Sequence, residues 1–124
     1  MASDAPRCPV LILPYPPTVN HYWLRNRNGS VRISPAGLAF RQEVALKCRQ
    51  ERIKRLTGRL AVVVEAFPPD NRRRDLDNVL KALLDALQHG GAFEDDSQID
   101  DLRIIRMASV PKNPQVWVTL ALLK

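Results

Sequence analysis

The sequence has no long apolar run and few residues that form disulfides or zinc sites. Its longest uninterrupted apolar runs, such as Val10–Leu13 and Leu60–Val64, are far too short to span a bilayer, so a membrane protein is excluded. The chain has only two cysteines and two histidines, which are Cys8, Cys48, His21 and His89. The cysteines form no CxxC pair, and the four residues lack the spacing of a zinc site. We therefore predict reduced thiols in a cytoplasmic protein.

The N-terminal residues also lack the pattern of a signal peptide. Asp4 and Arg7 place charges in this stretch, and Pro14 and Pro16 interrupt its apolar residues. What remains is an ordinary globular composition of 124 residues, of which 45% are hydrophobic and 26% charged. A chain of this length can bury a core without disulfides. We predict a single domain over residues 1–124.

Charge is distributed unevenly along the chain. The 19 Lys and Arg against 13 Asp and Glu give a formal net charge of +6, which favours a polyanionic partner such as nucleic acid. Residues 70–101 hold nine acids and four bases, a net −5, so the rest of the chain carries a net +11. These carboxylates would repel phosphate in a simple nucleic-acid binder, but in a nuclease they could hold a cation. A solvated acidic loop is the alternative that charge alone leaves open.

Turn and cap residues divide the chain into short elements. Asn28-Gly29 favours a hairpin turn, Ser34-Pro35 is typical of a helix start, and Thr57-Gly58 predicts where that helix ends. The predicted elements are a strand at Val10–Leu13, a hairpin of residues 22–24 and 31–33, a helix from Ser34 to about Leu56, a strand at Leu60–Phe67, a helix from about Asp75 to Gly90, and strands at Leu102–Val110 and Gln115–Leu123.

The last two strands are predicted to form an antiparallel pair, joined by a turn at Pro111–Pro114. The order of elements predicts a single small α+β domain, in which two main helices pack on a mixed β-sheet.

The segment after the valine-rich strand carries the densest charge. It reads Arg72-Arg73-Arg74-Asp75-Leu76-Asp77-Asn78 and opens an amphipathic helix, so it lies at a strand end, where functional sites tend to occur. Asp77, Lys81 and Asp85 are spaced by four residues and stack about 6 Å apart on the side opposite the leucines. Two ordinary alternatives exist. The aspartates could cap the helix, and Asp77 could form an ion pair with Lys81 worth about 0.3–0.5 kcal/mol.

A second acidic cluster, Glu94-Asp95-Asp96, follows the glycines that end this helix. The strand after it could return the cluster beside the first one. Mg²⁺ prefers one or two carboxylates together with waters and phosphate oxygens, and Asp75, Asp77 and one aspartate of the second cluster would meet that need. The spacing does not separate Asp95 from Asp96. A metal here would polarise a scissile phosphate and lower the pKa of an attacking water.

Basic residues next to this acidic site predict contacts with phosphate. Lys81 lies one turn from the expected metal and could steady the negative charge that develops on the phosphorane. Arg72, Arg73 and Arg74 can hold neighbouring phosphates through bidentate contacts. These four residues are the predicted DNA-binding set.

Several stretches of the chain share their order and spacing with a known family. They are Leu13–Thr18 with Asn20 and Tyr22, Ser34–Gly37, Arg72–Asn78 with Lys81, Asp85–Leu87, and Asp95-Asp96 with Gln98. Together they resemble the RusA-type Holliday junction resolvases of bacteria and their phages, over nearly the whole chain. The turn at Gly91–Glu94 departs from the family pattern, because it is more acidic and less aromatic.

The resemblance implies a RusA-like fold and an endonuclease that nicks four-way DNA junctions symmetrically, as a homodimer with Mg²⁺, in DNA recombination and repair. It implies that Asp75, Asp77 and Asp96 bind the metal and that Lys81 is catalytic, and it alone favours Asp96 over Asp95. We expect Mn²⁺ to substitute for Mg²⁺, no organic cofactor, and a location in the cytoplasm of a bacterium or a phage-infected host. The alternatives are a non-catalytic basic nucleic-acid-binding protein and a branched-DNA nuclease that acts on flaps or forks.

Overall fold

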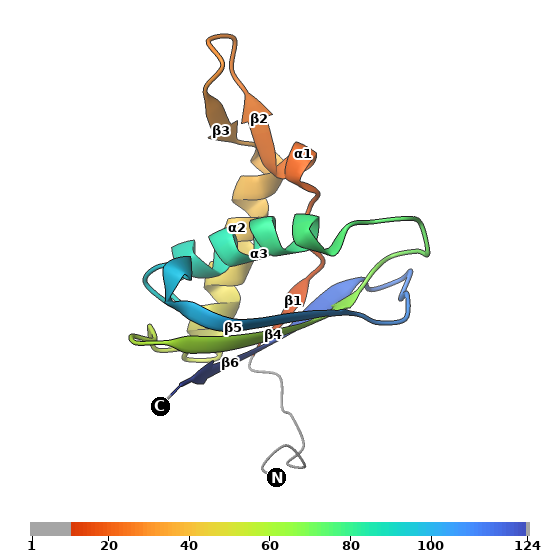
Figure 1. Cartoon of the computed structure of the whole chain (residues 1–124). Helices are drawn as coiled ribbons and strands as arrows, with labels where there is room; N and C mark the ends of the chain where they lie inside the picture. The colour runs from red at the N-terminus through yellow and green to blue at the C-terminus, as the bar shows by residue number, and fades with distance from the viewer. Residues whose placement is uncertain (1–10, 124) are drawn as a thin grey trace.

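The computed structural model describes residues 11–123, which form a four-stranded sheet, helices above it and a projecting hairpin (Figure 1). The elements in chain order are β1 (Leu11–Pro14), α1 (Val19–Tyr22), β2 (Trp23–Arg25), β3 (Val31–Ile33), α2 (Pro35–Gln50), β4 (Leu60–Phe67), α3 (Leu76–His89), the 3-10 helix η2 (Asp96–Gln98), β5 (Ile99–Arg106) and β6 (Gln115–Leu122). The predicted α+β class, with a mixed sheet and two main helices, is confirmed. Among these residues no helix has the length and apolar character needed to cross a membrane.

The sheet has the strand order β1-β6-β4-β5. β6 runs antiparallel to both β1 and β4, and β5 runs parallel to β4. β4 is therefore central, and Val64 pairs with Val118 on one side and Ile104 on the other. Every second residue of β4 is buried beneath the helices, which is the alternation expected when one face of a strand meets the core.

The predicted antiparallel pairing of the last two strands is wrong, because β4 lies between them. The connection after β5 crosses the end of β4 instead of forming a hairpin. Along it, the Met107 N–H donates to the Ala66 carbonyl and the Val110 N–H donates to the Pro68 carbonyl, both at 2.8 Å. This order pairs the valine-rich strand with β5 on one edge and β6 on the other, so neither edge of the most apolar strand is left open. The charged β5 lies at the sheet edge, where its exposed residues meet water.

Both main helices lie on the same face of the sheet (Figure 1). The core between them and the sheet is one cluster of buried residues, to which α2 contributes Phe40, Val44 and Cys48 at the predicted four-residue spacing. Each such apolar side chain stabilises the fold by about 1.5–3 kcal/mol when fully buried. Burial raises the pKa of the Cys48 thiol, so this thiol stays protonated and unreactive. Cys8 and Val10 lie outside the described residues.

The start of α2 is as predicted, but its end is not. The Ser34 hydroxyl accepts a hydrogen bond from the Gly37 N–H at 2.9 Å, and Pro35 follows it. The helix ends at Gln50, several residues before the predicted Leu56. Arg52 takes the left-handed conformation (φ 55°), and the Ile53 N–H then closes on the Cys48 carbonyl at 2.9 Å. Glycine usually occupies this left-handed position at the end of a helix. The sequence prediction therefore placed the end near Gly58, although Arg52 takes this position.

The predicted hairpin is confirmed as β2 and β3, which project away from the sheet (Figure 1). Tyr22 belongs to α1 and not to the strand, and α1 itself was not predicted. Gly29 at the turn has φ 88°, a value that glycine adopts without strain.

Candidate active site

The helix α3 begins at the loop that leaves β4, and its first turn carries two of the predicted aspartates. Asp75 is at the N-cap position (φ −86°, ψ 132°), but its side chain accepts no capping hydrogen bond. Asp77 lies in the first turn of the helix. No ion pair joins it to Lys81 in the part of the chain that the structure describes. The side-chain cap from Asp75 and the ion pair with Lys81 are therefore both wrong, while Asp77 in the first turn still has a favourable position for the helix dipole.

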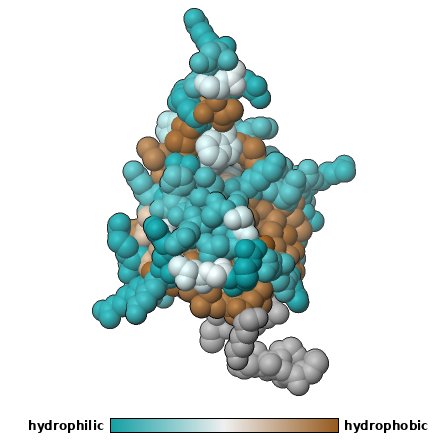
Figure 2. Space-filling model, turned by 60° about the vertical axis from the view of Figure 1, so that its left-hand side comes forward, coloured by the Kyte–Doolittle hydropathy of each residue, from teal (hydrophilic) through white to brown (hydrophobic). Residues whose placement is uncertain are grey.

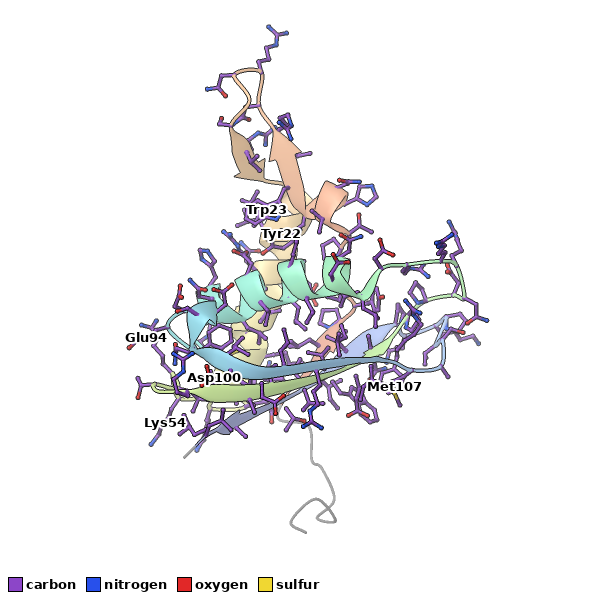
Figure 3. All side chains as sticks on the ribbon, viewed as in Figure 1. Tyr22, Trp23, Lys54, Glu94, Asp100 and Met107 are labelled. Atoms are coloured by element: carbon purple, nitrogen blue, oxygen red, sulfur yellow. The ribbon has the colours of Figure 1, made fainter. Side chains whose placement is uncertain are left out.

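A groove along α3 brings together residues from three elements. Its charged lining residues are Asp77, Lys81, Asp85 and Asp96, and the rest of its wall is formed by Trp23, Leu80, Leu84 and Gln88. The groove has a volume of about 490 Å³, and Figure 3 shows Tyr22 and Trp23 at the base of the hairpin, above α3. The helix and η2 thus place carboxylates from both acidic clusters, together with a lysine, beside an aromatic wall.

The 3-10 helix η2 separates Asp95 from Asp96. The Asp95 carboxylate accepts the Ser97 N–H at 2.9 Å, and the Gln98 side chain accepts the Asp95 N–H at 2.9 Å, which completes a capping box. The hydrogen bonds from Ser97 lower the pKa of Asp95. Asp96 is held near α3 because its N–H donates to the Gln88 side chain at 3.2 Å, and it lines the groove. The geometry therefore favours Asp96 over Asp95, as the family resemblance implied.

Asp75 lines a neighbouring cavity instead of the groove. This cavity has a volume of about 340 Å³, and Tyr15, Pro16, Arg73 and Asn78 are among its other lining residues. Within residues 11–123 no three His, Cys, Asp or Glu side chains are close enough together to hold a metal ion as they stand. Asp75 and Asp77 lie at the start of α3, whereas Asp96 is held through Gln88 near its C-terminal end. Of the three predicted ligands, only Asp77 and Asp96 line the same groove.

The other aspartates of the acidic segment, residues 70–101, already have hydrogen-bonding or ionic partners. Four of them, besides the capping Asp95, form hydrogen bonds or ion pairs with arginine, and they are Asp70, Asp85, Asp100 and Asp101. Asp75, Asp77 and Asp96 have no such side-chain partner among the described residues. The aspartates left free are therefore the three that were predicted as metal ligands. Hard carboxylate oxygens of this kind suit Mg²⁺, which needs only one or two of them and keeps several waters.

The three consecutive arginines have different surroundings. Arg74 donates to the Asp70 carboxylate at 2.6 Å, and its carbonyl accepts a hydrogen bond from Arg106. The hydrogen bond from Arg74 lowers the pKa of Asp70 to about 2. The Arg72 side chain is 84% exposed, with a looser contact to Asp70 at 3.4 Å, and Arg73 is exposed beside Asp75. Arg72 and Arg73 thus remain accessible to phosphate, whereas Arg74 mainly orders the loop.

Sequence reasoning missed a network that joins the hairpin base to α3. The buried Tyr22 hydroxyl donates to the Asp85 carboxylate, and Arg41 donates to the same carboxylate at 2.8 Å. Burial and the hydrogen bond to Asp85 raise the pKa of Tyr22, so its hydroxyl stays protonated. The Arg41 guanidinium also lies 5.8 Å from the centre of the Trp23 ring. Asp85 is therefore a partner of Tyr22 and Arg41. The three residues are far apart in the sequence, and no local signal links them.

The chain is similar to known proteins over most of its length. Residues 14–121 match the family model described as "Endodeoxyribonuclease RusA". The chain is 50% identical over 101 residues to the crossover junction endodeoxyribonuclease rusA of Enterobacteria phage HK97, which covers 81% of this chain and 83% of the relative. It is 39% identical over 111 residues to the crossover junction endodeoxyribonuclease RusA of Escherichia coli strain K12, with 89% and 91% covered. The same enzyme of Enterobacteria phage 82 is 40% identical over an equal span.

Proposed function

The chain belongs to the RusA family of endodeoxyribonucleases, and we propose that it resolves four-way DNA junctions by nicking them symmetrically. The observation that carries this proposal is the groove in which the free Asp77 and Asp96 lie with Lys81. The surrounding basic residues would attract the DNA backbone, while the concentrated carboxylates would repel it unless a cation were present.

The donor set of the groove fits a divalent cation of the Mg²⁺ class. Asp77 and Asp96 would hold it, with Asp75, close to Asp77 at the start of α3, as the third carboxylate. Mn²⁺ would substitute because it prefers the same oxygen ligands. When bound, the ion would supply an activated water and neutralise charge on the scissile phosphate. Hydrolysis by a metal-activated water needs no organic cofactor, and we propose none.

The basic residues around the groove have separate roles in this proposal. Lys81 lines the groove one helical turn from Asp77, so its ammonium group would stabilise the negative charge that develops at the cleaved phosphate. Arg72 and Arg73 would bind the phosphates on either side. Arg74 would act chiefly by holding the loop through Asp70.

Symmetric nicking requires two equivalent sites, and each chain carries one set of Asp75, Asp77 and Asp96. We therefore propose a homodimer with two-fold symmetry, which presents two sites to the two like strands of a junction. Light scattering should give the mass of a dimer at working concentration. A strict monomer that still resolves junctions would contradict this assembly. The relatives come from bacteria and bacteriophages, so the proposed place of action is the bacterial cytoplasm.

The test compares a synthetic four-way junction with linear duplex and flap DNA, each with and without Mg²⁺. We expect paired nicks of the junction only when Mg²⁺ is present, little cutting of duplex, and loss of cutting in Asp77→Asn. Asp101→Asn is the matched control, because this carboxylate pairs with Arg103 on β5 and lies outside the groove. Junction binding without cleavage in any divalent cation would favour the non-catalytic DNA-binding alternative. Equal cutting of flaps would favour the branched-DNA nuclease.

A further inference from the structure

The hairpin of β2 and β3, with its turn, forms an arm over residues 23–33 that projects from the body (Figure 1). Its turn is ordered by its own hydrogen bonds. The Asn26 N–H donates to the Ser30 carbonyl at 2.7 Å, and the Ser30 N–H donates to the Asn28 side chain at 3.0 Å. The arm contributes little to the core, since its exposed residues include Arg25, Arg27 and Arg32. Its size and order therefore call for an explanation other than packing.

The charge of this arm is entirely positive. The chain has no Asp or Glu between Leu11 and Gln42. Across residues 11–123, Arg25 and Arg27 form no ion pair, in contrast to Arg41, Arg59, Arg74 and Arg103, which each pair with an aspartate. The tip of the arm is hydrophilic, and hydrophobic residues lie below it (Figure 2). Unpaired arginines on a projecting element are suited to contact with a polyanion.

The base of the arm is fixed to the helices that carry the candidate site. The Ser34 N–H donates to the Tyr22 carbonyl at 2.9 Å, and the Ser34 side chain is buried. A Cβ added to Gly37 would lie only 2.6 Å from the Tyr22 carbonyl oxygen, so α2 approaches the arm closely. The Tyr22 hydroxyl is bonded to Asp85 on α3, the helix that also carries Lys81. The direction of the arm relative to the groove is therefore set by packing and hydrogen bonds.

One face of the arm continues the wall of the groove. Trp23 lines the groove beside Lys81 and also lines a second hollow together with Arg25 and Val31. Trp23 pairs with Ile33, and Arg25 pairs with Val31. Because residues two apart on a strand share a face, Arg25 points to the same side as Trp23. The unpaired Arg25 therefore lies next to the groove, on the face of the arm that continues its wall.

We propose that this arm binds the backbone of the DNA duplex that leads away from the cleavage site, with Arg25 and Arg27 on its phosphates. This inference rests on the proposed function, since it takes the groove as the place of cutting. At about 3.3 Å per strand residue, the tip lies roughly 15 Å beyond Trp23, or about four base pairs along the duplex. The arm thus adds phosphate contacts on one side of the cut.

The test compares two double variants with the same loss of charge. Arg25→Gln with Arg27→Gln changes the arm, and Lys47→Gln with Arg49→Gln changes exposed bases near the other end of α2 as a control. Junction affinity is measured over a range of salt concentrations. We expect the slope of log K against log salt to fall by about four in the arm variant, since the proposed dimer has two arms with two contacts each and each phosphate contact contributes about 0.9. The cleavage rate of fully bound junction should stay that of the wild type.

A second measurement uses the unaltered protein. Ethylation of single phosphates should weaken binding roughly four base pairs from the nick, on one side, in addition to the phosphates at the nick itself. The arm proposal is overturned if the arm variant matches the control in slope and these distant phosphates have no effect, while the wild type cuts junctions normally. If the wild type cuts no junction but the arm variant still loses affinity, the proposed function fails and the arm remains a DNA-binding element.

Discussion

Asp95 and Asp96 are adjacent in the sequence, but their carboxylates have different surroundings. Asp95 accepts the Ser97 N–H at 2.9 Å and caps η2, whereas Asp96 lines the groove of Asp77 and Lys81. The cap begins the short helix η2, which leads directly into β5. It uses one carboxylate for local structure and leaves the next one free toward the proposed substrate.

The free aspartates at the start of α3 should be needed for cleavage but not for binding. Asp77→Asn and Asp75→Asn keep the size of each side chain and remove the anionic oxygen that Mg²⁺ prefers. We expect single-turnover cleavage to fall by several orders of magnitude. Junction affinity in the absence of metal should be equal or higher, because one charge that repels phosphate is lost. Near-normal cleavage by Asp77→Asn would contradict the proposed metal site.

Arg73 and Arg74 should respond differently to substitution. Arg73→Gln should lower the slope of log K against log salt by about two, because the proposed dimer loses one exposed phosphate contact from each chain. Arg74→Gln should chiefly disturb the loop, since Arg74 is bonded to Asp70 at 2.6 Å, and its salt slope should stay near that of the wild type. Filter binding or fluorescence anisotropy across a salt series checks both. An unchanged slope in Arg73→Gln would show that this side chain does not contact phosphate.

Tyr22→Phe should lower stability and leave the fold intact. The change removes the hydrogen bond to Asp85 and the one that Arg41 donates at 3.2 Å, while Arg41 still pairs with Asp85. We expect a loss of about 0.5–1.5 kcal/mol in the free energy of unfolding, measured by denaturant titration. Tyr15→Phe is the matched control, since the Tyr15 hydroxyl has no side-chain partner in the described residues. Equal stability of the two variants would exclude a structural role for the network.

The stabilising effect of Asp70 on the loop before α3 should be lost at acid pH. The pKa of this carboxyl falls from 3.8 to about 2 in the folded chain, mainly because Arg74 donates to it. A lowered pKa means that the stabilising effect is complete above about pH 4 and is lost as the pH falls toward 2. The melting temperatures of the wild type and Asp70→Asn should therefore differ at neutral pH and converge near pH 2. A constant difference over this range would argue against the pairing with Arg74.

Local signals predicted much of the fold, and long-range pairing was the part that they did not contain. The Ser34-Pro35 start of α2 and the Asn28-Gly29 turn depend on neighbouring residues, and both are present as predicted. The placement of β4 between β5 and β6 depends on which strand buries most apolar surface in the assembled sheet, and no short segment encodes it.

In the candidate site, too, local signals predicted some features, and contacts between distant segments could not be predicted. Helical spacing placed Asp77 and Lys81 on one side of α3, and the structure has both in one groove. The choice between Asp95 and Asp96 could also have been made from the sequence, because an acidic residue followed three positions later by Gln98 is typical of a capping box. The contact of Tyr22 with Asp85 joins distant segments, so only the folded chain shows it.

The most direct test of this account is the cleavage rate of a four-way junction by Asp95→Asn and Asp96→Asn, measured under single-turnover conditions in Mg²⁺. The two variants lose the same charge at adjacent positions, and asparagine can still cap a helix, so both should keep the melting temperature of the wild type. Asp95→Asn should cut at close to the normal rate, and Asp96→Asn should lose several orders of magnitude in rate. A normal rate in Asp96→Asn, or an equal loss in both variants, would contradict the assignment of the groove as the catalytic site.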